Sequence, residues 1–263
     1  MLRAKKKKRG PGVEVNLDTL FVEAKAESTL GAEGWNTLSV SYQCSNITSN
    51  SLIKLPPQER LGDDVGEAEL IGTYLDPILS SIFHNPENNR QLRWLNTGVQ
   101  DTESQRPDGN IFQLEQRRVQ FSTGYVEVKP DKTCAQTRKI HEDTLQLVNF
   151  CKDTIDKQNV ESKISVQVVG YYVSIYLISL EANGLYLIIE LFFFNVPKCI
   201  PELPPFMMNL DQLKQIMLSH ETHCILSNEN RTSRKRFSIQ KVSLQEIINV
   251  KKPRNLRPSL AFK

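Results

Sequence analysis

The sequence predicts a mixed α/β domain. Helical and strand patterns follow one another in the order helix, strands, helix, strands, helix, an order typical of a sheet covered by helices. Residues 64–83 carry apolar side chains at three- and four-residue spacing, as an amphipathic helix does. The dipeptide Asn183-Gly184 separates two strand-like runs and is a strong signal for a two-residue hairpin turn.

The first half of the domain is expected to hold one helix followed by strands. The helix over 64–83 contains Pro77, which lacks a backbone N–H and therefore predicts a kink. The strand pattern after this helix is short and interrupted. The expected elements are a strand over 92–96, a loop over 97–109, strand pieces over 110–114 and 117–121, and a strand over 124–129 that ends before Pro130.

The second half of the domain is expected to begin with a helix and to continue with three longer strands. The expected elements are a helix over 140–159, strands over 163–170, 171–182 and 185–196, and a last helix over 211–219. The run IELFFF, residues 189–194, is strongly apolar. It predicts a buried central strand, and the contact face of a possible homodimer is the open alternative.

Both ends of the chain are predicted to be tails. Residues 1–55 lack sustained periodicity, so we expect disorder there with a short helix near 17–26. The folded domain is expected over 56–226 and a basic tail over 227–263. Six of the first nine residues are Lys or Arg, and ten more lie between Arg231 and the end. These clusters indicate nuclear import or contact with nucleic acid, and solvated tails are the alternative.

Composition and cysteine usage limit the setting in which the protein works. Of the 263 residues, 39% are hydrophobic and 24% are charged, which is ordinary for a globular protein. The net charge of +3 says little about partners. We expect no membrane span and no secretion, because no run of about 18 apolar residues and no signal-peptide core is visible. The five cysteines are scattered, which suits a reducing compartment. We therefore expect an intracellular protein of the nucleus or cytoplasm.

The segment GYVEVKP, residues 124–130, places two charged side chains in a strand. Side chains alternate between the faces of a strand, so Glu127 and Lys129 share one face with Tyr125, and the intervening valines face the core. Two interpretations are open. The pair lies in water on a wet face, or it belongs to a site that needs a carboxylate and an amine together.

Two further acids favour a site. Asp108 follows Pro107, and one turn with one strand would bring it back beside Glu127. Glu67 shares a helical stripe with Ile71, where an ionised carboxylate is costly unless it meets a cation. Glu67 could instead lie at the edge of the core, because the helix begins there.

Converging carboxylates have a clear chemical use with Mg²⁺, a hard cation that prefers oxygen ligands. The expected ligands are Asp108, Glu127, the backbone carbonyl of Val128, and Glu67. Lys129 would neutralise charge that develops on a phosphate. This set of groups suits phosphodiester hydrolysis better than acyl transfer.

The pair Pro107-Asp108, followed by the EVK of residues 127–129, resembles the signature of the PD-(D/E)XK nuclease superfamily. Over about residues 64–170, this resemblance implies a restriction endonuclease-like core: a helix, three strands, a helix and a strand in a mixed central sheet flanked by helices. It further implies an endonuclease that depends on Mg²⁺ or Mn²⁺ and cleaves DNA more often than RNA. The form RPDG…GYVEVKP looks like eukaryotic members of the superfamily rather than a named enzyme.

The resemblance also implies roles for individual residues. Asp108, Glu127 and Lys129 match its three motif positions. An acid of the first helix often joins them, and Glu67 matches that place, with Glu69 as the alternative.

Several basic residues are candidate contacts to nucleic acid phosphates, with solvated surface positions as the alternative. They are Arg117, Arg118, Lys132, Arg138 and Lys139. The predicted function is a Mg²⁺-dependent endonuclease. A non-catalytic module on the same scaffold that binds nucleic acid or protein is the alternative.

Overall fold

A computed structural model describes residues 46–60, 65–95, 107–133, 136–182 and 184–227. In these ranges one sheet holds six strands in chain order, from β1 to β6. β3 and β4 are parallel, and every other neighbouring pair is antiparallel. The strands are β1 (Arg90–Trp94), β2 (Gly109–Glu115), β3 (Arg118–Lys129), β4 (Ser162–Val169), β5 (Tyr172–Ala182) and β6 (Leu185–Asn195). The predicted α/β class is confirmed.

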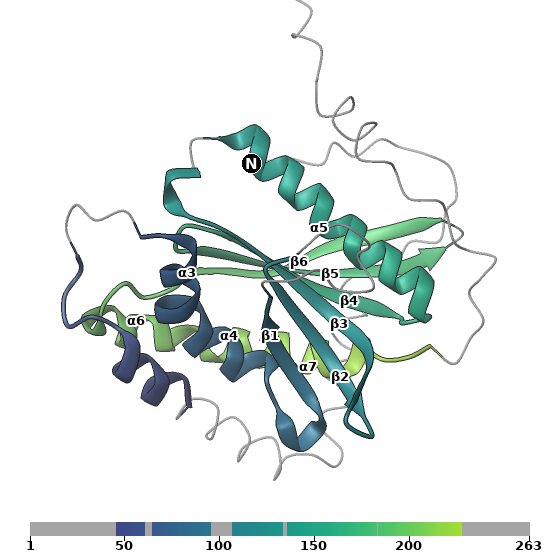
Figure 1. Ribbon diagram of the computed structural model, residues 1–263, viewed down its shortest axis with the longest axis horizontal. Coiled ribbons are helices and arrows are strands. Elements are labelled where there is room, and N and C mark those ends of the chain that lie inside the picture. Colours follow the sequence, from purple (N-terminus) through teal and green to yellow (C-terminus); the bar gives the residue numbers. More distant parts are fainter. Residues whose placement is uncertain (1–45, 61–64, 96–106, 134–135, 183, 228–263) are drawn as a thin grey trace, which may run out of the picture. The chain divides into compact units, whose positions relative to one another are not determined.

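Helices cover both faces of this mixed sheet (Figure 1). α5 (Thr137–Gln158) connects β3 to β4 and lies on one face, as the crossover between parallel strands requires. α4 (Asp76–Phe83) and α7 (Leu210–His223) lie on the other face. The short helical pieces are η2 (Pro86–Asn88), η4 (Asp131–Thr133), η5 (Ile200–Glu202), α6 (Leu203–Phe206) and η6 (Met207–Asn209).

The first predicted helix forms, but its irregularity precedes the proline. It consists of α3 (Glu67–Glu69), a π-helical turn η1 (Leu70–Leu75) and α4. The backbone N–H of Asp76 bonds to the carbonyl of Ile71, five residues back. Because Pro77 has no N–H to donate, the helix changes its bonding pattern just before it.

β3 is one long strand where the sequence predicts two pieces. It pairs with β2 through a tight turn at Gln116 and Arg117, which have φ values of 48° and 67°. Two successive positive φ values are typical of a type I′ turn, whose twist matches that of the strands it joins. Arg117 is therefore a turn residue, and Arg118 is the first residue of β3.

The folded part begins before residue 56, where the sequence predicts a tail. Residues 46–54 are helical, and Ile47 and Leu55 are buried in the core with α4. Burying one such side chain contributes about 1.5–3 kcal/mol. The predicted boundary is wrong because a helix of under ten residues carries too little periodicity to stand out.

The prediction of a buried central strand over 189–194 is also wrong. β6 is the last strand of the sheet, and Leu185, Ile188 and Phe193 are about half exposed. Its apolar composition therefore does not reflect burial on both faces.

Three other expectations fall on residues outside the described ranges: the helix near 17–26 and the basic stretches at the start and after residue 227. Among the helices that the structure describes, none has the length and apolar character needed to cross a membrane.

Candidate functional site

β3 directs Glu127 and Lys129 toward α5. Tyr125, two residues earlier on the same face, is fully buried against Leu147 and Phe150 of that helix. Val126 and Val128 point into the core on the opposite face, as predicted. The wet-face interpretation is wrong, because α5 covers this face and leaves Glu127 only 7% exposed.

Asp108 lies directly beside the charged pair, as the sequence predicts. Gly109 pairs with Val126, so the register places Asp108 opposite Glu127. The Asp108 Oδ2 atom accepts a hydrogen bond from the backbone N–H of Val128 at 2.6 Å. Its backbone carbonyl accepts another from the N–H of Leu95 at 2.8 Å. The first bond therefore fixes the carboxylate beside the end of β3, and the second fixes the backbone of Asp108.

The Lys129 ammonium lies among these acids. Its Nζ donates to Glu127 Oε1 at 2.5 Å and to the carbonyl of Val128 at 3.2 Å. It lies 4.0 Å from Asp108 Oδ2. Glu127 Oε1 and Asp108 Oδ2 therefore both lie close to one amine. These two oxygens consequently lie close to each other as well.

A fourth acid, Asp143 of α5, joins the site without having been predicted. Its Oδ2 lies 4.0 Å from Lys129 Nζ and is buried, with no hydrogen-bond partner among the described residues. The sequence does hold a signal for it. Asp143 continues the helical stripe of Leu147 and Cys151 at four-residue spacing, so it is a carboxylate on an otherwise buried face.

Burial raises the pKa of the acids at this site. The pKa of Glu127 rises to about 7, because burial and the Asp108 charge outweigh Lys129. Burial also raises the pKa of Asp108 and of Asp143, against the lowering effect of Lys129. Burial alone would lower the pKa of Lys129, but Glu127 and the other acids raise it. The site thus holds more negative charge than its lysine neutralises.

Of the two candidate acids in the first helix, Glu67 is the one near this site. Glu67 is exposed at the first residue of α3, so the buried-stripe interpretation is wrong and the edge position is correct. Partial burial of the carboxyl nevertheless raises the pKa of Glu67, and the Asp108 charge adds to this rise, whereas Lys129 opposes it. Glu69 instead forms an ion pair with Arg60.

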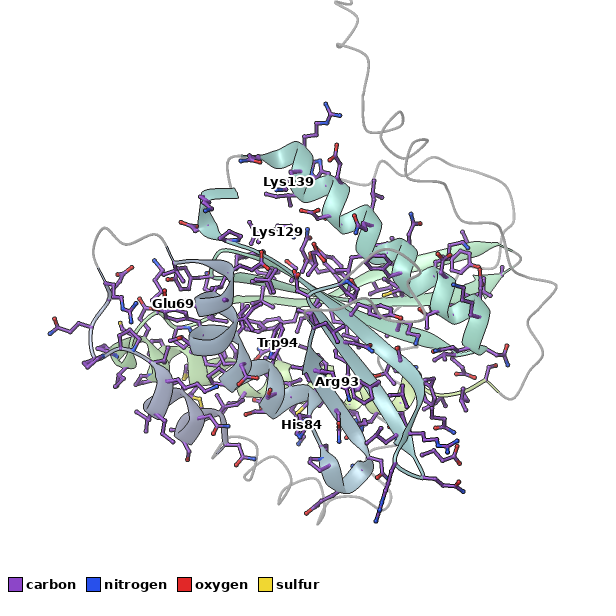
Figure 2. The ribbon with its side chains drawn as sticks, in the orientation of Figure 1. Glu69, His84, Arg93, Trp94, Lys129 and Lys139 are labelled. Atoms are coloured by element: carbon purple, nitrogen blue, oxygen red, sulfur yellow. The ribbon has the colours of Figure 1, made fainter. Side chains whose placement is uncertain are left out.

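The predicted phosphate contacts divide into two groups. Lys132 is exposed just after β3, and Arg138 and Lys139 are exposed at the start of α5, which lies above Lys129 (Figure 2). Arg138 bonds to Glu142 at 2.9 Å. Arg117 and Arg118 lie at the opposite end of β3, about 35 Å away at roughly 3.3 Å per residue. Arg117 and Arg118 therefore do not lie near the acidic site.

The charge and chemistry of these residues fit a divalent cation, although their side chains are not arranged to coordinate one in this structure. Within the described ranges, no three His, Cys, Asp or Glu side chains are grouped so as to hold a metal ion. Lys129 lies between the acids and bonds to one of them. Glu127 Oε2 is nonetheless buried without a hydrogen-bond partner among the described residues. An unpartnered buried carboxylate oxygen is costly, so a hard cation would satisfy it.

Comparisons with known proteins return nothing for this chain: no family model, no curated protein and no solved structure matches it.

Proposed function

We propose that Asp108, Glu127 and Lys129 form the centre of a nuclease that uses Mg²⁺ or Mn²⁺ to hydrolyse phosphodiester bonds, with DNA as the preferred substrate. The observation that carries the proposal is the Glu127 carboxylate. It is ionisable and 7% exposed, and one of its oxygens is unpartnered among the described residues. A structural ion pair with Lys129 alone would leave that oxygen unpaired.

The proposed roles of the residues follow from their chemistry. Asp108, Glu127 and the Val128 carbonyl would hold the cation, with Glu67 reaching in from α3. The cation would supply a polarised phosphate and a more acidic water. Lys129 carries a fixed positive charge at the end of β3, where it can donate a hydrogen bond to a phosphate oxygen as negative charge develops there. Lys132 and Lys139 would contact neighbouring phosphates.

The order of the elements supports the resemblance to the PD-(D/E)XK superfamily. A helix precedes three antiparallel strands, and α5 then leads to a fourth strand parallel to the third. The motif residues lie at the end of that third strand and in the turn before the second. The element order is the part of this arrangement that the resemblance implies.

One observation favours the alternative, a non-catalytic module that binds nucleic acid. Lys129 bonds to Glu127 at 2.5 Å, and this closed pair leaves one fewer carboxylate oxygen for a cation. A protein that binds nucleic acid without cleaving it would not need this pair to open.

Cleavage of plasmid and of labelled single-stranded DNA, with Mg²⁺ or Mn²⁺, tests the proposal. We expect metal-dependent nicking that falls at least about 100-fold in each of Glu127→Gln, Asp108→Asn and Lys129→Met. These substitutions nearly conserve volume, and thermal melting confirms that each variant folds. Glu87→Ala, at an exposed position of η2, is the control and should cleave as the wild type does.

Two results would overturn the proposal. One is DNA binding without cleavage under every metal condition, which supports the module instead. The other is cleavage that survives in all three variants, which would trace the activity to a contaminant.

A further inference from the structure

Lys129 is held by Glu127 in this structure, and a cation bound to Glu127 Oε2 and to Asp108 would compete with Lys129 for the charge of these carboxylates. Its Nζ has one close anionic neighbour, Glu127 Oε1 at 2.5 Å. The other close partner is the Val128 carbonyl at 3.2 Å, itself a proposed ligand. With part of the carboxylate charge neutralised by the cation, a further anion would be needed to hold the ammonium as firmly in place.

Asp143 is placed to provide that anion. It comes from α5, which carries none of the proposed ligands. Its side chain is 14% exposed, and its Oδ2 lies 4.0 Å from Lys129 Nζ. That distance is too long for a hydrogen bond, and Oδ2 has no hydrogen-bond partner among the residues described here. A small movement of the flexible lysine stem would make the contact.

The helix turn that carries Asp143 is held firmly on the sheet. Gln167 of β4, the cross-strand neighbour of Glu127, donates to the carbonyl of Ile140 at 3.1 Å and to Thr144 Oγ1 at 2.6 Å. These two acceptors flank Asp143 in the sequence. The backbone at Asp143 is therefore fixed relative to the strand that carries the site.

We propose that Asp143 is a positioning residue, which holds the Lys129 ammonium in the site when Asp108 and Glu127 bind a cation. This inference rests on the proposed function. It assigns Asp143 to the lysine and not to the metal, so its loss should affect turnover and leave cation binding intact.

The first test measures steady-state cleavage and Mn²⁺ binding in Asp143→Asn. We expect kcat to fall about 10- to 100-fold, the range for lost partners of site residues, with KM for DNA and the Mn²⁺ Kd within about twofold. Asp143→Glu should recover part of the rate. Asp153→Asn, on the same helix ten residues on and paired with Lys152, is the matched control and should keep its rate.

The second test does not need cleavage, so it separates a failure of this inference from a failure of the proposed function. Glu127→Gln removes the charge that holds Lys129 without any cation. Amine labelling of Lys129 at fixed pH, read by mass spectrometry, should then stay slow in Glu127→Gln and rise at least about threefold in Glu127→Gln/Asp143→Asn, as coupled neighbours predict.

Equal labelling in the single and double variants would overturn the inference. Loss of Mn²⁺ binding in Asp143→Asn comparable to that in Asp108→Asn would also overturn it, because Asp143 would then be a ligand.

Discussion

At the scale of single residues, the main feature of the site is that burial raises the pKa of its carboxyl groups. The pKa of the Glu127 carboxyl is about 4.5 in the unfolded chain, whereas it is about 7 in the folded protein. The folded protein therefore binds a proton here that the unfolded chain has released. The stability contributed by this proton is fully present at low pH and is lost as the pH rises through 7.

We expect the metal-free protein to lose stability relative to Glu127→Gln as the pH rises from 5 to 8. The shift of the Glu127 pKa from 4.5 to about 7 corresponds to roughly 3 kcal/mol at most. Urea unfolding in EDTA at several pH values measures the difference. Subtracting the variant removes the opposite effect of buried His220, whose pKa is lowered to about 3 by burial. A difference that does not change with pH would contradict the expectation.

At the scale of elements, the unit formed by β3, α5 and β4 holds the site together. Its strands pair closely at Gly124, where a Cβ atom would lie 2.6 Å from the backbone carbonyl of Ile164. Backbone atoms cannot yield to such a contact without moving a strand. Gly124 thus permits the close parallel pairing that continues to Glu127 and Gln167.

Gly124→Ala should therefore destabilise the protein by about 1–3 kcal/mol, the usual cost of overpacking. Gly72→Ala is the matched control, because a Cβ atom at Gly72 meets nothing within 4 Å and the residue is helical. This second substitution should be neutral or stabilise by up to about 1 kcal/mol. Thermal melting by circular dichroism measures both. Equal melting temperatures for the two variants would contradict the account of Gly124.

At the scale of the whole molecule, the sheet ends in an apolar strand. β6 is 11 residues long and lies at the edge of the sheet within the described residues. Leu185, Ile188 and Phe193 are 54%, 49% and 51% exposed. Long apolar edge strands favour pairing with another chain, so the homodimer that the sequence suggests stays a prediction with a defined place.

We expect concentration-dependent self-association through β6, and Phe193→Lys should weaken it by placing a charge on the edge. Sedimentation velocity over a range of concentrations measures the effect. Met208→Lys is the control, because Met208 is 82% exposed in η6 and lies off this strand. Monomeric wild-type protein at all concentrations would contradict the prediction.

The sequence by itself determined the fold class, the order of the main elements from residue 64 onward and three members of the candidate site. Asp108, Glu127 and Lys129 were predictable because strand alternation sets which side chains share a face, and a turn of known position returns the chain to the same edge. The β5–β6 hairpin was predictable for the same kind of local reason, since its turn signal lies within two residues.

Only the tertiary structure decided what covers each face. Asp143 joins the site because α5 crosses over β3 and β4, a packing that depends on residues far apart in the chain. The same crossover buries Glu127, and the end position of β6 exposes a run whose composition predicts burial. Local patterns specify the direction of a side chain, whereas its solvent and its neighbours follow from the way distant elements pack.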